Sequence, residues 1–147
     1  TCYRVLGGEI IAKLMCLVLF LTVPMTMQRP EVPQGGFWNF WLRFVYWIDS
    51  PTNLFPSIHC FVSWLGTRYI YECRSLRHRG LTCTLCTVGS VLVFLATMFT
   101  KQHVFYDVIS GVAVAEIGWL VARYTGLPRL FERLNERFLR TKLAQMI

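Results

Sequence analysis

Two short polar stretches stand at the entrances of apolar segments, and their residue types are those of acid–base or nucleophilic chemistry. The first, "NLFPSIHCF", contains Ser57 and His59. The second, "FTKQHVFYDVISG", contains Lys101, His103 and Asp107. Histidine is the side chain whose charge changes most readily near neutral pH, so each imidazole is a candidate for proton transfer. The two stretches therefore have to be explained together.

The second stretch has a histidine and a carboxylate at a spacing that lets them cooperate. His103 and Asp107 are four residues apart, so they share a face of a helix. A carboxylate beside one ring nitrogen fixes the tautomer and supports positive charge on the ring, which leaves the other nitrogen free as a base or nucleophile. Such a pair is more often structural than catalytic, so it does not assign a function by itself.

The other polar residues are suited to an anion. Ser57 begins an apolar helical segment, where free N–H groups favour negative charge. Arg29 carries a fork of donors that matches phosphate, and Lys101 adds a second positive charge. With His59 and His103 against the anion, this set could perform phosphoryl transfer. The basic groups would stabilise the phosphoryl oxygens, one histidine would attack, and the other would protonate the departing alkoxide.

The neighbours of the two histidines predict which one attacks. His103 has a carboxylate one turn away, and this carboxylate would stabilise a phosphorylated, positively charged ring. His59 has no acidic residue within one turn and stands at a helix start, where the dipole disfavours a cation. We therefore expect His103 to be the nucleophile and His59 to protonate the leaving group.

Each of these residues also has a simpler interpretation. A single histidine at a helix entrance is usually an interfacial side chain, and Arg29 and Lys101 alone would be headgroup anchors. His59, His103 and Asp107 could instead hold a metal ion, but the pattern favours this less, and we expect neither a metal nor another cofactor. The argument for chemistry depends on whether the chain gathers these residues in one place.

Composition indicates a membrane protein. The chain of 147 residues is 54% hydrophobic and 15% aromatic, with 16% charged residues. Residues 81–100 carry no charge, and Glu116 is the only charged residue in 108–122. Apolar runs of about 18 to 20 residues are long enough to cross a hydrocarbon core of about 30 Å.

We expect an all-α fold in a single membrane-embedded domain over residues 1–147. The aromatic segment "FWNFWLRFVYWI" is too short to span and suits the headgroup layer. The predicted elements are four spanning helices at residues 10–26, 57–73, 82–100 and 104–124, the interfacial helix at 37–48, and an amphipathic basic tail at 129–147.

The charges predict how this bundle is oriented. Arginines concentrate in residues 74–80 and 129–142, beside apolar spans, as expected for cytoplasmic segments. The net charge of +7 is thereby explained without nucleic acid, which we do not expect as a partner. Counting crossings then places the unusual polar residues together on the non-cytoplasmic face of the cell membrane: Arg29, Ser57, His59, Lys101, His103 and Asp107.

Arg68 and Glu116 are ionisable residues within the predicted spans and need partners there. Arg68 and Glu116 both lie about 16 to 20 Å below the polar layer at the helical rise of 1.5 Å per residue. We expect them to approach each other. The alternative is that Arg68 extends to the cytoplasmic surface or pairs with Glu72 one turn on.

Small residues predict where the last span packs closely. Gly111, Ala115 and Gly118 repeat at spacings of four and three. Small side chains let membrane helices approach each other. We expect this stripe to face the span that carries Ser57 and His59, which would bring the two histidines together.

Three motifs resemble the signature motifs of the type 2 phosphatidic acid phosphatase superfamily of membrane lipid phosphatases. They are "RP" at 29–30, "PSIH" at 56–59 and "HVFYD" at 103–107. The stretch "DSPTNLFPSIHC" is similar to bacterial members and to the inositol phosphorylceramide synthase branch. The resemblance covers roughly residues 20–125. It implies a six-helix membrane fold, of which one or two N-terminal helices are expected to be absent from this chain, and a metal-independent mechanism.

The resemblance also implies roles for the site residues. His103 would be the nucleophile, Asp107 its orienting partner and His59 the general acid. The substrate phosphate would be held by Arg29, Ser57 and Lys101.

Some positions depart from the family pattern. Thr22 stands where a lysine opens the first motif, and Ile58 where a glycine is usual. Ala96 and Thr97 stand where the third motif opens with serine and arginine, and Lys101 could supply the missing charge from one turn later. These changes suit the transferase-like branch as well as a phosphatase.

We therefore expect a phosphoric ester hydrolase of the membrane that cleaves a lipid phosphate monoester or diphosphate through a phosphohistidine intermediate. Its expected partners are the lipid phosphate substrate and the bilayer. The closest alternative is a phospho-headgroup transferase of the inositol phosphorylceramide synthase type, which moves the group to an alcohol instead of water. A non-catalytic membrane scaffold or lipid-binding protein is the rival from another class.

Overall fold

The computed structural model describes residues 2–52 and 54–145. This part of the chain is helical, with no β-strand beyond an isolated bridge between Thr26 and Thr52. The predicted all-α fold is confirmed. The helices are α1 (Cys2–Thr22), α2 (Phe37–Ile48), α3 (Ile58–Glu72), α4 (Arg79–Phe99), α5 (Phe105–Tyr124) and α6 (Leu127–Gln145).

The helix bounds follow the predicted segments closely, except in α1. Helix α2 coincides with the predicted interfacial segment, and α3, α4 and α5 begin and end within three residues of the predicted spans. Helix α1 begins at Cys2, eight residues before the predicted start. The apolar run is interrupted by the charged residues near the N-terminus, but the helix continues through them. Glu9 forms an ion pair of 2.6 Å with Lys13, one turn further along the same helix.

Three helices of the described chain, α1, α4 and α5, are long and apolar enough to cross a membrane. They are compatible with an integral membrane protein. The fourth predicted span is not confirmed, because α3 has only 15 residues. At 1.5 Å per residue it is about 22 Å long, less than the roughly 30 Å of a hydrocarbon core.

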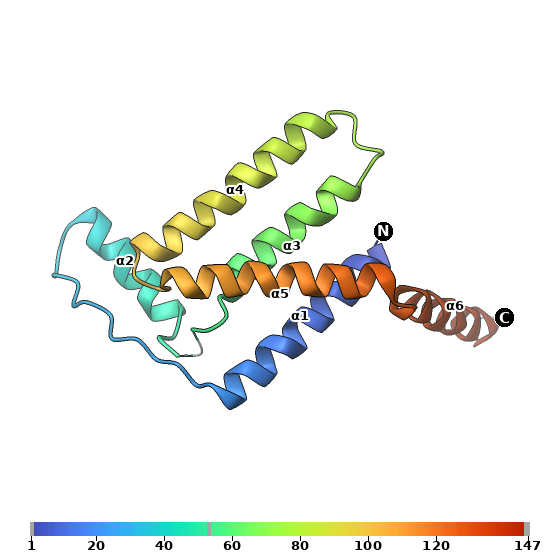
Figure 1. Cartoon of the computed structure of the whole chain (residues 1–147), viewed down its shortest axis with the longest axis horizontal. Helices are drawn as coiled ribbons and strands as arrows, with labels where there is room; N and C mark the ends of the chain where they lie inside the picture. The colour runs from blue at the N-terminus through green and yellow to red at the C-terminus, as the bar shows by residue number, and fades with distance from the viewer. Residues whose placement is uncertain (1, 53, 146–147) are drawn as a thin grey trace.

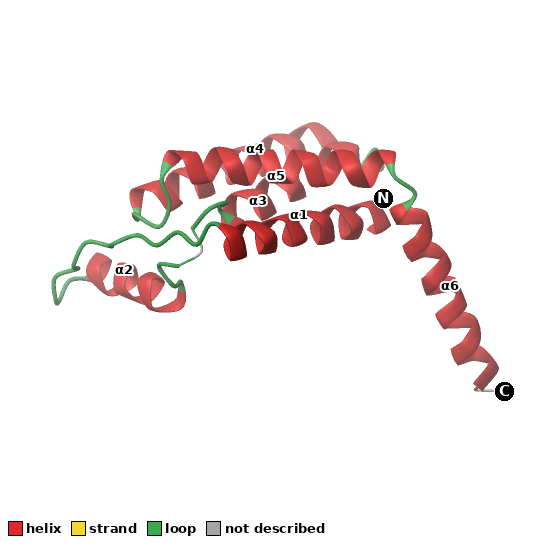
Figure 2. Cartoon of the chain, turned by 60° about the horizontal axis from the view of Figure 1, so that its bottom comes forward, coloured by secondary structure: helices red, strands yellow, loops and turns green. Residues whose placement is uncertain are grey.

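The four longer helices before α6 form one bundle (Figure 1). Helix α5 packs against both α1 and α3, and α4 packs against α3. Helix α2 lies beyond one end of the bundle, and α6 projects away from the other end (Figure 2). The buried core is formed mainly by α1, α3 and α5 through Ala12, Cys16, Phe61, Leu65, Tyr69, Val114, Ala115 and Trp119.

Two glycines of α5 let neighbouring backbones approach. A Cβ at Gly111 would lie 2.6 Å from the carbonyl oxygen of Ser57, so this position faces α3 as predicted. A Cβ at Gly118 would instead lie 2.7 Å from the carbonyl oxygen of Gly8, so this end of the stripe faces α1, and the prediction is wrong there. The reason is that α5 packs on α3 near its start and on α1 further along.

The predicted pairing of Arg68 with Glu116 is confirmed. Arg68 Nε lies 2.9 Å from Glu116 Oε1. The Trp64 indole N–H donates to the same oxygen at 2.7 Å. The Arg68 guanidinium also lies over the Trp119 ring, 4.0 Å from its centroid. Inside an apolar bundle, these contacts compensate both charges.

Helix α2 has the exposure expected of an interfacial aromatic helix. None of its residues is buried, and Trp38 and Trp47 are each 80% exposed. The hydroxyl of Tyr46 donates to the carbonyl of Thr100 at 2.7 Å, which ties α2 to the end of α4. Amphipathic aromatic helices of this kind lie at membrane surfaces.

Candidate active site

The bundle brings the two polar stretches together at one end. His59 lies in the first turn of α3, and His103 lies in the connection between α4 and α5. Their ring centroids are 5.8 Å apart, at an interplanar angle of 64°. Both rings line a cavity of about 310 Å³, together with Asp49 and Leu54. The sequence prediction that these histidines share one site is consistent with this geometry.

A tight reversal of the backbone fixes the position of His103. Lys101 has a left-handed φ of 54°, and its N–H donates to the carbonyl of Met98 at 3.1 Å. The N–H groups of Gln102 and His103 both donate to the carbonyl of Thr97, at 2.9 and 3.1 Å. This is the hydrogen-bond pattern that commonly ends a helix on a left-handed residue. It holds His103 against the end of α4 just before α5 begins.

The predicted pair of His103 and Asp107 is present and buried. Nδ1 of His103 lies 3.4 Å from Oδ2 of Asp107, and the two side chains are 7% and 4% exposed. The contact is electrostatic and is not aligned as a hydrogen bond. The same oxygen accepts from the N–H of Val104 at 3.0 Å, so Asp107 also caps the start of α5.

Burial and charge act on His103 in opposite directions. Burial lowers the pKa of His103 below its ordinary value of 6.5, and the Asp107 carboxylate opposes this. Of the more distant groups, His59 lowers the pKa of His103 and Asp49 raises it. The net lowering keeps the ring neutral at neutral pH, with the Asp107 carboxylate on the Nδ1 side. A lone pair on Nε2 is then available for attack.

Asp49 is the site residue that sequence reasoning missed. It follows α2 directly and opens the stretch "DSPTNLFPSIHC". Its Oδ1 lies 3.7 Å from Nε2 of His59. His59 has no acidic residue within one turn along the chain, as noted from the sequence, but folding brings Asp49 beside it. The sequence did contain a sign of this role. Asp49 is an acidic residue at the end of an aromatic helix, and it opens the stretch that carries Ser57 and His59.

Arg29 is held by Asp49 and by backbone carbonyls. Its Nη2 lies 2.8 Å from Oδ2 of Asp49, and its Nη1 donates to the carbonyl of Tyr46 at 3.3 Å. Gln102 donates to the same Asp49 oxygen at 2.9 Å. The Arg29 side chain is 7% exposed and lies over the Tyr46 ring. In this arrangement the guanidinium is neutralised by the protein and lies outside the lining of the histidine cavity.

Ser57 and Lys101 occupy different environments. Ser57 is fully buried and caps α3, since its Oγ accepts from the N–H of Cys60 at 3.4 Å. Its own N–H donates to the carbonyl of Asp107 at 3.1 Å, which joins the starts of α3 and α5. Lys101 is exposed, in the same turn as His103 but outside the lining of the cavity. The structure thus brings together the two histidines and the carboxylates of Asp49 and Asp107. Of the three predicted phosphate ligands, Arg29 is engaged by Asp49, Ser57 caps α3, and Lys101 lies outside the lining of the cavity.

Fold and site together define a helical protein with membrane-spanning potential and a histidine–carboxylate cluster at one end of its bundle. Comparison with family models, with curated proteins and with solved structures finds no match for this chain. Its function therefore has to be argued from the site itself.

Proposed function

We propose that this protein is a membrane phosphatase that hydrolyses a lipid phosphate monoester or diphosphate through a phosphohistidine. One observation carries the proposal. His59 and His103 come from separate segments, face the same cavity with ring centroids 5.8 Å apart, and each lies beside a carboxylate. Two imidazoles in one cavity supply both a nucleophile and a proton donor.

In the first step, the lone pair on Nε2 of His103 attacks phosphorus. The bond between phosphorus and the lipid oxygen breaks, and protonated His59 gives its proton to that oxygen. Asp107 stabilises the positive charge that the attacked ring acquires. Asp49 Oδ1 lies 3.7 Å from Nε2 of His59, so this carboxylate can orient the ring that gives up the proton.

In the second step, a water molecule attacks the phosphorus of the phosphohistidine. Neutral His59 takes the proton of this water, the bond between phosphorus and nitrogen breaks, and inorganic phosphate leaves. His103 is again neutral and His59 is again protonated. The pair thus returns to its starting state without a metal ion or another cofactor.

The phosphate needs positive partners, and three lie near the histidines. Arg29 would exchange part of its contact with Asp49 for a phosphate oxygen, and Lys101 would reach in from the turn before α5. The N–H groups at the start of α3, where Ser57 is the cap, add partial positive charge. These contacts to substrate belong to the proposal.

The resemblance of the three motifs to the type 2 phosphatidic acid phosphatase superfamily supports the same proposal. We place the histidine cavity on the non-cytoplasmic face of the membrane. In this arrangement α3 crosses as a short fourth helix, shielded by α4 and α5, and its charged residues Arg68 and Glu72 are paired within the bundle. The chain then acts on lipids that present their phosphate at the outer surface.

A phosphate-release screen tests the proposal. The purified full chain is offered a panel of lipid phosphates, with and without a long-chain alcohol, and released phosphate and phosphorylated alcohol are measured separately. We expect inorganic phosphate from at least one lipid, at least 100-fold less in His103→Ala, and unchanged release in His78→Ala, which alters an exposed histidine outside the cavity.

Two other outcomes would identify the alternatives. Transfer to the alcohol in preference to water would make the protein a phospho-headgroup transferase and overturn the hydrolase. Turnover of no lipid in either arm, with bound lipid detected, would favour a non-catalytic lipid-binding protein.

A further inference from the structure

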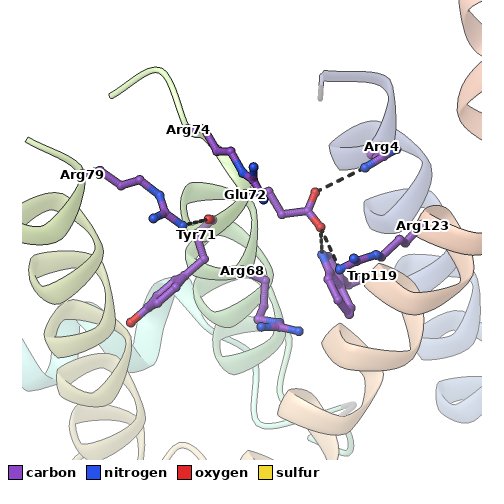
Figure 3. A pocket seen from close by; sticks show the side chains of 8 residues that line it. All are labelled: Arg4, Arg68, Tyr71, Glu72, Arg74, Arg79, Trp119 and Arg123. Atoms are coloured by element: carbon purple, nitrogen blue, oxygen red, sulfur yellow. Dashed lines mark hydrogen bonds and ion pairs between the residues drawn. The ribbon is translucent and has the colours of Figure 1, made fainter. Parts of the chain in front are cut away.

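A second charged cavity lies at the opposite end of the bundle from the histidines. Its volume is about 390 Å³. At 1.5 Å per residue, the length of α3 separates the two cavities by about 20 Å. Figure 3 shows the residues that line it, which come from α1, α3, the following loop, α4 and α5: Arg4, Arg68, Tyr71, Glu72, Arg74, Arg79, Trp119 and Arg123.

The charges in this cavity do not balance. Its lining has five arginines and a single carboxylate, that of Glu72. Glu72 lies between two of them, with Nη1 of Arg4 at 3.8 Å and Nη1 of Arg123 at 3.7 Å (Figure 3). Both distances are longer than a charge-assisted hydrogen bond. Arg68, deeper in the bundle, is paired with Glu116, so the excess positive charge is concentrated at the mouth.

Several guanidinium groups are already oriented. Arg79, the first residue of α4, donates to the carbonyl of Tyr71 at 2.6 Å, which directs its side chain toward the end of α3 (Figure 3). Arg123 lies over the ring of Trp119, 5.0 Å from its centroid, and the Trp119 indole N–H donates to Glu72 at 2.9 Å. Arg74 comes from the loop after α3 and also lines the cavity (Figure 3). Side chains held as those of Arg79 and Arg123 are lose less conformational entropy when a ligand binds.

We infer that this cavity binds a phosphate group, carried by the headgroup of an anionic membrane lipid or free in solution. Arginine forks match phosphate oxygens with paired hydrogen bonds, and the surplus of positive charge favours an anion. The cavity opens at the ends of α1, α4 and α5, the helices with membrane-spanning potential. Basic pockets between membrane helices are typical sites for anionic headgroups. The inference does not depend on the chemistry of the histidine site.

Binding by the purified full chain in detergent tests it. The probes are dioctanoyl phosphatidylglycerol, zwitterionic dioctanoyl phosphatidylcholine and inorganic phosphate, and affinity is measured by native mass spectrometry. We expect phosphatidylglycerol to bind in preference to phosphatidylcholine. Arg74→Gln should weaken phosphatidylglycerol binding about tenfold, and Arg4→Gln should do the same from another helix.

Two matched variants make the result specific. Arg77→Gln removes the same charge from the same loop, but Arg77 is exposed and outside the lining, so affinity should be unchanged. His103→Ala alters the other cavity and should leave phosphatidylglycerol affinity unchanged, because this phosphodiester is outside the monoester and diphosphate class proposed for that cavity. Because Arg74 and Arg77 are both exposed, the melting temperature of each variant should stay near that of the parent protein.

The outcomes separate the possible sources of the phosphate group. Inorganic phosphate that binds alone, and is weakened by Arg74→Gln, supports the site with a free anion as its ligand. An equal loss in Arg77→Gln would overturn the proposal in favour of unspecific attraction to a basic surface. Loss in His103→Ala with retention in Arg74→Gln would overturn it by placing the anion among the histidines. Binding of no probe would overturn it as well.

Discussion

His59 and His103 face one cavity but differ in how far they are removed from water. The His103 side chain is 7% exposed, whereas the His59 side chain is 47% exposed. The buried ring has a carboxylate fixed by the start of α5, and the open ring has a carboxylate that also binds Arg29. A nucleophile benefits from a fixed position, and a group that exchanges protons with substrate and water benefits from access. This difference supports assigning attack to His103.

The covalent intermediate is the first prediction at this scale. Acid-labile, base-stable phosphate should be found on His103 after rapid denaturation of the enzyme during turnover. His59→Ala should still form it with a substrate whose leaving group needs no proton, because attack itself does not require the second ring. Peptide mapping under alkaline conditions measures it. Phosphate on His59, or on no residue while turnover continues, would contradict the assignment.

The second prediction concerns pH. Attack needs neutral His103, so kcat/KM should fall on the acid side as this ring is protonated. Burial lowers the pKa of His103, which places this acid limb below pH 6.5. Because the Asp107 carboxylate raises the pKa of His103, Asp107→Asn should move the limb to still lower pH while reducing kcat. A limb that moves to higher pH in Asp107→Asn would show that another group is being titrated.

Sequence alone could predict some site residues and not others, and the difference is physical. The His103–Asp107 pair is one turn apart in sequence, so helical periodicity is enough to predict it. The closeness of His59 and His103 was predicted by counting membrane crossings, which places both residues on the same face. The contact of Asp49 with His59 and Arg29 depends on how the chain folds back after α2, and no periodicity encodes that path.

At the scale of helices, the start of α5 is held against the start of α3 by a glycine. Gly111→Leu should force these backbones apart, because even a Cβ would lie 2.6 Å from the Ser57 carbonyl oxygen. We expect activity to fall about 100-fold, since displacement of catalytic groups by about 1 Å has effects of this size. Overpacking should also cost about 1–3 kcal/mol of stability.

The matched control for this prediction lies on α4. Gly89 has no atom within 4 Å of a Cβ position, and it is exposed, so Gly89→Leu should leave activity and melting temperature close to those of the parent protein. Phosphate release and thermal unfolding measure the two effects. Full activity in Gly111→Leu would show that the helix approach does not set the histidine geometry.

Lys101, in the turn between α4 and α5, has two features that one variant can test: its positive charge and its left-handed backbone conformation. Lys101 has a φ of 54°, a region in which glycine is unstrained and other residues are strained by about 1 kcal/mol. Lys101→Gly should therefore retain or raise stability. If the ammonium group binds substrate phosphate, the same variant should raise KM about tenfold. An unchanged KM with a higher melting temperature would show that Lys101 does not bind the substrate phosphate and contributes only to the turn.

Helix bounds were predictable where apolar runs marked them, as for α4 and α5. The start of α1 was not, because Arg4 and Glu9 interrupt its hydropathy but not its helix, in which Glu9 pairs with Lys13 one turn on. Helix α3 was predicted one residue too long at each end, since Ser57 and Cys73 are its caps, and its 15 residues are fewer than a typical span. Its charged residue Arg68 was predicted to pair with Glu116 of α5, and the ion pair is present.

Over the whole molecule, the polar groups divide between two ends of an apolar bundle. The histidine cavity and α2 lie at one end, and the arginine cavity lies at the other. Between them, large apolar side chains remain exposed on the outer surface of the bundle, as in a protein surrounded by hydrocarbon. Examples are Leu17, Val18, Leu85, Leu92 and Ile117.

The difference in charge between the two ends predicts how the bundle is oriented in the membrane. The arginine-rich end should be cytoplasmic by the positive-inside rule, and the loop before α2 should face outward. Single cysteines at Gln34 and Ser75, both exposed positions, report the two ends in a chain whose native cysteines are replaced. A membrane-impermeant thiol reagent should label Gln34→Cys in intact cells and label Ser75→Cys only after permeabilisation.

The orientation decides what each cavity can meet. With Ser75 inside, the arginine cavity faces the leaflet that carries anionic lipids, whose surface potential attracts basic groups. The histidine cavity would then meet phosphates on the outer surface, with the exposed aromatic helix α2 at the level of the headgroups. Labelling of Ser75→Cys and protection of Gln34→Cys in intact cells would reverse both assignments. In that case the lipid phosphate acted on by His103 would have to be supplied from the cytoplasmic leaflet.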